Sequence, residues 1–182
     1  MTGQRYIAFL RAINVGGRVV KMVTLKAIFE KMGFSEVATF IASGNVIFTA
    51  KALDGSTLEM SIERALQKAL GYPVTTFLRT TDELAAVAAR DPFGKPIPDN
   101  GRLFVGFLRD APPAVARKRV AALGTATDDF QVHGRELYWL CATPSMQSIV
   151  SGATLEKLLG APATLRNVNT VRRLVARYPP AP

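Results

Sequence analysis

Two periods of apolar residues alternate along the first half of the chain, and they predict different elements. Runs rich in β-branched and aromatic residues are typical of strands, whereas apolar residues three and four apart are typical of an amphipathic helix. Four strands are predicted, at 6–14, 37–41, 46–49 and 74–79. Between the first two strands lies a helical stripe that Gly33 ends, formed by Met22, Leu25, Ile28, Phe29 and Met32.

A second amphipathic helix is predicted between the last two of these strands. Ser56 and Glu59 have the spacing of a capping box, in which each side chain bonds the backbone N–H of the other residue. Gly71 is expected to end this helix. Its apolar stripe is Leu58, Ile62, Ala65, Leu66 and Ala69.

A third helix is predicted to begin at the capping box of Thr80 and Glu83 and to end before Asp91, because a residue that precedes proline disfavours the helical conformation. Residues 92–101 are rich in Pro and Gly and are interpreted as a linker between a half at 1–91 and a half at 102–182. The same order then returns as a strand at 103–108, a helix at 112–123, a hairpin at 130–133 and 136–140, a helix at 154–159, a short strand near Thr164 and a helix to Arg177.

The repeated order predicts an α+β fold of two ferredoxin-like (βαββαβ) halves with antiparallel sheets, plus a C-terminal helix. The 182-residue length and the 48% hydrophobic content suit a globular protein, and no apolar run approaches the ~20 residues that span a bilayer. We therefore expect a cytoplasmic protein. Cys141 lies in an apolar run and is predicted to be a buried thiol, while His133 is predicted to occupy a turn. No metal site or cofactor is expected from these residues.

Polar residues at the end of the first strand form the first of three motifs, Arg11-Ala-Ile-Asn-Val-Gly-Gly17. In a βαββαβ sheet the first and third strands are antiparallel neighbours, so the end of the first strand and the turn before the third lie at one edge. The first motif is therefore predicted to meet Ser43, Gly44 and Asn45. Arg11 is expected to share a strand face with Ile7, Phe9 and Ile13.

The chemistry at this edge suits an anion. Glycine lets a ligand approach the backbone, and the N–H groups at the start of the following helix favour negative charge. The formal net charge of +9 points the same way. The predicted ligand-binding residues of this edge are Arg11, Asn14, Gly16, Gly17, Arg18, Lys21, Ser43, Gly44 and Asn45.

The third motif introduces the last helix and contributes Arg166, Asn167, Asn169 and Thr170 to the predicted site. Either asparagine can cap the helix, and the group together can form a phosphate cradle. We expect this motif to join the first two if the halves dock head to tail. Within the helix Val171, Leu174 and Val175 are predicted to be buried.

Three functions are compatible with these patterns. The leading hypothesis is a binding protein for a phosphorylated small molecule or a nucleic-acid backbone. An RNA-recognition sheet is disfavoured, because the third strand offers only Phe48 for base stacking. The second is a group-transfer or hydrolytic enzyme, although no histidine or carboxylate lies in the motifs to serve Ser43. The third is a structural or partner-binding protein in which Gly, Asn and Ser form only turns and caps.

The motifs also resemble those of a bacterial family of unknown function, DUF1697. The similar segments are 11–17, Lys21-Met22, 39–48, 155–160 and 164–170. The resemblance implies ferredoxin-like α+β units and no particular reaction. Two positions depart from the family pattern: Ile149 follows Ser148 where a lysine is usual, and Val168 stands where tryptophan is usual. A lysine acting as a base or phosphate ligand is therefore missing here.

Overall fold

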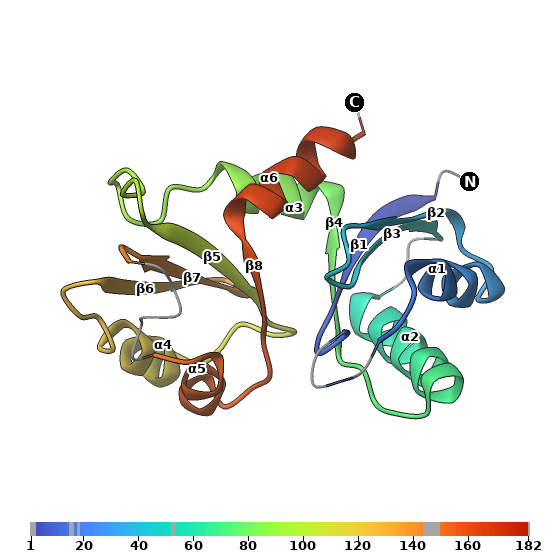
Figure 1. Ribbon diagram of the computed structural model, residues 1–182, viewed down its shortest axis with the longest axis horizontal. Coiled ribbons are helices and arrows are strands. Elements are labelled where there is room, and N and C mark those ends of the chain that lie inside the picture. Colours follow the sequence, from blue (N-terminus) through green and yellow to red (C-terminus); the bar gives the residue numbers. More distant parts are fainter. Residues whose placement is uncertain (1–2, 15–16, 18, 52–53, 144–149, 182) are drawn as a thin grey trace. The chain divides into compact units, whose positions relative to one another are not determined.

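The computed structural model describes residues 3–14, 17, 19–51, 54–143 and 150–181. The chain divides into two compact units, residues 1–84 with 178–182 and residues 85–177. Each unit contains a four-stranded antiparallel sheet with two helices on one face (Figure 1). The predicted fold class is confirmed. The division falls within α3 (Thr81–Ala89), and the linker at 92–101 stays a prediction.

The first sheet has the strand order β2-β3-β1-β4. All of its pairs are antiparallel, and Phe9 of β1 lies opposite Asn45 of β3 and Phe77 of β4. The elements of this unit are β1 (Gln4–Leu10), α1 (Met22–Lys31), β2 (Ser35–Phe40), β3 (Asn45–Ala50), α2 (Gly55–Leu70) and β4 (Thr76–Thr80).

The core of the first unit lies between the sheet and α1 and α2. Phe29 of α1 meets Phe48 of β3 edge to face, with ring centroids 5.3 Å apart. The opposite sheet face is also apolar and buried, with Ile7 and Phe9 at 0% exposure. Burial on both faces explains why β1 is apolar without alternation.

The first strand ends at Leu10 and not at residue 14, which corrects the sequence prediction. Ala12 and Asn14 have φ angles of 59° and 57°, in the left-handed region that a strand does not tolerate. The alternation of strand faces therefore stops, and Ile13 packs in the same core as Leu10. The expectation that Ile13 shares a strand face with Ile7, Phe9 and Arg11 is accordingly wrong.

The predicted capping box of α2 is also wrong, because a carboxylate two residues earlier takes its place. Asp54 is the N-cap residue and accepts a hydrogen bond from Thr57 N at 3.0 Å. Glu59 is buried and accepts a hydrogen bond from Leu78 N of β4 at 2.8 Å. Gly71 ends the helix with a φ of 80°, as predicted.

The capping box of α3 is confirmed in both directions. Glu83 N donates to Thr80 Oγ1 at 3.2 Å, and Thr80 N donates to a carboxylate oxygen of Glu83 at 2.8 Å. The backbone N–H groups of Thr80 and Glu83, which have no partner within the helix, are thus each hydrogen-bonded to the side chain of the other residue.

The second sheet repeats the first with the order β6-β7-β5-β8, and α4 and α5 cover one face (Figure 1). Gly134, with a φ of 57°, turns the β6–β7 hairpin. His133 is the last residue of β6 and pairs with Glu136, so the prediction that it occupies the turn is wrong. Val171 and Leu174 of α6 are buried as predicted, whereas Val175 is only half-buried. The elements of this unit after α3 are β5 (Arg102–Phe107), α4 (Ala114–Ala121), β6 (Asp128–His133), β7 (Glu136–Cys141), α5 (Gly152–Leu159), β8 (Thr164–Asn167) and α6 (Val168–Arg177).

Candidate functional site

The end of β1 and the turn between β2 and β3 lie together at one edge of the first sheet. Leu10 N donates to Gly44 O at 2.8 Å, and Asn14 Nδ2 donates to Ala42 O at 3.2 Å. The predicted meeting of these segments, about thirty residues apart, is therefore confirmed. We call Arg11–Asn14, Gly17, Val19–Val23 and Ile41–Asn45 the polar edge.

The Asn14 amide also brings the start of α1 to the polar edge. Its Oδ1 atom accepts a hydrogen bond from Val20 N at 2.5 Å. Lys21 follows as the N-cap residue, makes no side-chain cap hydrogen bond, and is exposed. The first turn of α1 contains no acidic residue. Asn14 thus joins the end of β1, the β2–β3 turn and the start of α1. The N-cap side chain of α1 accepts no hydrogen bond from the first turn of the helix.

Asn45 holds the β2–β3 turn closed from inside. It is fully buried, and its Nδ2 atom donates to Phe40 O at 3.0 Å and to Ser43 Oγ at 2.8 Å. Gly44 has a φ of 72°, and a Cβ atom there would lie 3.2 Å from the Cβ atoms of Leu10 and Ile13. These contacts make Asn45 and Gly44 parts of the edge's framework.

The backbone is strained on both sides of the polar edge. Ala12, Asn14 and Ile41 have positive φ angles, of 59°, 57° and 50°. A β-branched residue such as Ile41 rarely adopts this conformation, and each such residue costs on the order of 1–3 kcal/mol. Strain of this kind is often found at functional sites, where the surrounding structure holds it in place.

Charged and apolar side chains share the surface of the polar edge. The Arg11 side chain is half-buried, and the backbone N–H of Arg11 donates to Thr75 O at 2.9 Å. Lys21 is exposed. Val19, Val23 and Ile41 are exposed by 84%, 70% and 43%. Gly17 is exposed with a φ of 82°, while the predicted site residues Gly16 and Arg18 lie outside the described residues.

The C-terminal motif lies where β8 meets α6 in the second unit. Asn167 Oδ1 accepts a hydrogen bond from Asn169 N at 2.9 Å, so Asn167 is the asparagine that caps. The guanidinium of Arg166 donates to Thr164 Oγ1 at 2.8 Å and to Leu165 O at 2.9 Å. Burial lowers the pKa of Arg166 to about 10. Thr170 is half-buried and Asn169 is exposed. The meeting of this motif with the polar edge stays a prediction.

The structure describes only one of the two positions, Ile149 and Val168, that depart from the family pattern. Val168, where the resemblance implies a tryptophan, is the first residue of α6 and is buried at 2% exposure, so its side chain packs in the protein interior. Ile149, like Ser148, lies outside the described residues.

Cys141 is a buried free thiol, as predicted. Burial raises its pKa, with a contribution from the nearby Asp128 carboxylate. Its Sγ atom donates to Thr143 O at 3.0 Å. These surroundings suit a core residue, because a raised pKa keeps the sulfur as the weakly reactive thiol. Within the described parts of the chain, no three His, Cys, Asp or Glu side chains gather as a metal site would require.

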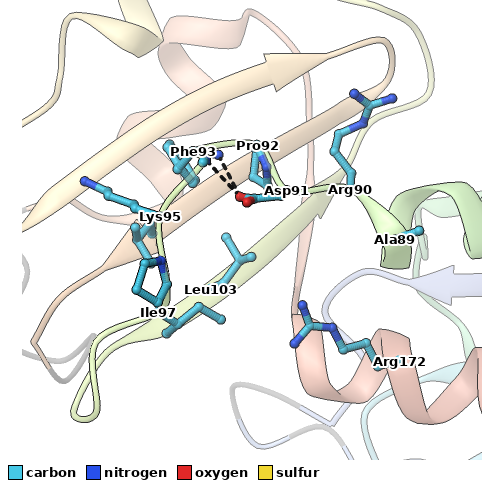
Figure 2. Close-up of a pocket in the computed structure, with 12 residues that line it drawn as sticks. Ala89, Arg90, Asp91, Pro92, Phe93, Lys95, Ile97, Leu103 and Arg172 are labelled. Carbon is cyan, nitrogen blue, oxygen red and sulfur yellow. Dashed lines mark hydrogen bonds between the residues drawn. The ribbon is translucent and has the colours of Figure 1, made fainter.

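A hollow that the sequence patterns do not predict lies within the second unit. It has a volume of about 460 Å³ and is lined by residues 89–97, by Leu103 of β5, by Leu140 of β7 and by Arg172 of α6 (Figure 2). Proline and glycine at 92–101 predicted a linker, and no local pattern links that segment to Leu140 or Arg172. We call this hollow the α6 pocket.

The two sheets, each of βαββαβ order, define an α+β protein with two ferredoxin-like units. The chain belongs to the family described as "Protein of unknown function (DUF1697)", whose model matches residues 3–138. The family recognition made from the sequence is thereby confirmed, while the similar segments 155–160 and 164–170 lie outside the matched residues.

A solved structure with this fold is the conserved bacterial protein SP0830 from Streptococcus pneumoniae. It is 18% identical, with a TM-score of 0.70 over 96% of this chain and 98% of that chain. At this identity the likeness concerns the fold. No curated protein matches the chain. Among the described residues, no helix has the length and apolarity needed to cross a membrane.

Proposed function

We propose that the protein binds an anionic ligand at the polar edge. The observation that carries the proposal is the pair of hydrogen bonds of Asn14, which joins the start of α1 to the β2–β3 turn.

The single cysteine, a buried free thiol, supports a cytoplasmic location.

The electrostatics at the start of α1 support an anion. The N-terminus of a helix carries about +0.5 elementary charge, and its first N–H groups have no partner within the helix. Lys21 adds a full positive charge at the N-cap position, and no acid in the first turn offsets it. Arg11 adds a second cation on the same edge.

The polar edge suits two kinds of phosphate. One is the phosphoryl group of a small molecule, and the other is the backbone of a nucleic acid. The exposed aliphatic side chains Val19, Val23 and Ile41 border the cations and favour a small molecule with an apolar part, because a nucleic-acid backbone would leave them uncovered.

A thermal-shift and titration screen with ATP, glucose 6-phosphate, pyrophosphate and oligothymidylate tests the proposal. A ligand that binds only the native state stabilises it by about 2.7 kcal/mol at a hundredfold excess over Kd. We expect at least one of these anions to raise Tm. Lys21→Gln should then weaken its binding about fivefold, the effect of about 1 kcal/mol.

Lys31→Gln provides the matched control. It removes the same charge from the same helix at the other end, where Lys31 is exposed. If both variants lose affinity equally, the anion responds to net charge and not to the polar edge. If no anion raises Tm, the proposal fails.

A partner-binding role is the second candidate, supported by the exposure of Val19, Val23 and Ile41. Failure of every anion in the screen would favour it. The enzymatic alternative has less support at Ser43, because its Oγ atom accepts a hydrogen bond from the Asn45 amide, and an amide N–H cannot take up the hydroxyl proton.

A further inference from the structure

The α6 pocket has the size and lining of a small-molecule site. Its volume of about 460 Å³ lies within the range of ligand pockets, which is about 300–1,000 Å³. Leu103 and Leu140 lie opposite each other on the adjacent strands β5 and β7, and both line the pocket. Figure 2 shows Ile97 beside Leu103. An apolar surface of this kind fits the body of an organic molecule.

The charges around the α6 pocket do not cancel. The Asp91 carboxylate accepts hydrogen bonds from Phe93 N at 3.3 Å and Gly94 N at 2.9 Å, so it stabilises the turn that follows it (Figure 2). Lys95 forms an ion pair with Asp129. Two cations of the lining, Arg90 and Arg172, then remain to be considered.

Arg90 and Arg172 outnumber Asp91, the one carboxylate in the pocket lining, so the lining keeps a net positive charge. In the parts of the chain that the structure describes, neither guanidinium has a hydrogen bond or an ion pair. Figure 2 shows Arg172 extending from α6 toward Leu103 and Ile97. A guanidinium binds a carboxylate or a phosphate through two parallel hydrogen bonds, so the Arg172 guanidinium matches an anionic head.

From this lining we infer that the α6 pocket binds a small organic anion, a carboxylate or phosphate on an apolar body. The apolar part would lie on Leu103, Leu140 and Ile97, and the anionic head would meet Arg172. This site is separate from the polar edge and does not depend on the function proposed there.

Calorimetric titration of the full-length protein with phenyl phosphate, and with benzoate as a second arm, tests the inference. We expect one or both to bind, inorganic phosphate to bind more weakly because it lacks the apolar body, and benzyl alcohol not to bind because it lacks the charge. Arg172→Gln should weaken binding about tenfold, through loss of a charge-assisted pair. Methyl NMR signals of Leu103 and Leu140 should shift on titration.

Two control variants keep the result specific. Arg119→Gln removes an exposed arginine of α4 in the same unit and should leave binding unchanged. Lys21→Gln, at the polar edge, should also leave it unchanged. The inference is overturned if neither anion binds, if Arg119→Gln weakens binding as much as Arg172→Gln, or if the Leu103 and Leu140 signals stay fixed. Circular dichroism checks that each variant is folded.

Discussion

At the scale of single residues, the polar edge depends on side chains that face inward as much as on those that face the solvent. Asn14 bonds backbone atoms at positions 20 and 42, and Asn45 donates to the backbone oxygen of Phe40 and to the Ser43 Oγ atom. Such amides hold a turn in one conformation and compensate for the strain of residues such as Ile41. The turn and cap interpretation of these residues is therefore compatible with a binding role, since a rigid edge presents its cations in fixed positions.

We predict that Gly44→Ala destabilises the protein by about 2–3 kcal/mol, measured by urea unfolding. A left-handed alanine costs roughly 1–2 kcal/mol, and the added Cβ would also press on Leu10 and Ile13 at 3.2 Å. Gly71→Ala is the control, because Gly71 also has a positive φ but no atom lies within 4 Å of the place that its added Cβ would take. Equal losses in the two variants would contradict the close packing of the β2–β3 turn.

At the scale of elements, two helices share one sequence signature and use it differently. Thr80 and Glu83 form a reciprocal capping box at α3, whereas Ser56 and Glu59, at the same spacing, do not cap α2. Asp54 caps α2 instead, and its hydrogen bonds with Ser56 and Thr57 hold the pKa of its carboxyl below the usual value. Its contribution to stability is therefore present above the ordinary aspartate pKa and is lost as the pH falls through the lowered one.

We predict that Thr80→Ala lowers the free energy of unfolding by about 1 kcal/mol, because it removes the side-chain acceptor of Glu83 N. Ser56→Ala should have a clearly smaller effect, since Ser56 contacts the Asp54 carboxylate without capping the helix itself. Chemical denaturation of the two variants and the wild type measures both values. A larger loss in Ser56→Ala would restore the capping role that the sequence pattern predicts for it.

At the scale of the whole molecule, one topology is used twice. The orders β2-β3-β1-β4 and β6-β7-β5-β8 are equivalent, so β1 and β5 occupy the same position in their sheets. Both central strands are hydrogen-bonded on two sides, and residues on both faces of each strand are buried. The two candidate sites occupy different places in the repeat, the polar edge at the end of β1 and the α6 pocket over β5 and β7.

We predict that the amides of β1 and β5 exchange with solvent more slowly than those of the edge strands β2 and β6, by on the order of tenfold or more. An edge strand is bonded on one side only and opens with the loss of fewer contacts. Hydrogen–deuterium exchange followed by NMR gives the rates. Equal protection in β2 and β1 would contradict a first sheet whose stability is centred on β1.

By itself, the sequence determined the element order, the fold class and the meeting of Asn14 with Ser43–Asn45, because these follow from local apolar periods and from the antiparallel pairing that βαββαβ order imposes. Tertiary structure alone decided that β1 stops at Leu10, that Glu59 bonds Leu78 N across to β4, and that Arg172 stands beside residues 89–97. Each of these rests on contacts between residues distant in the chain or on a backbone conformation that its surroundings stabilise. Local propensity carries no information about either.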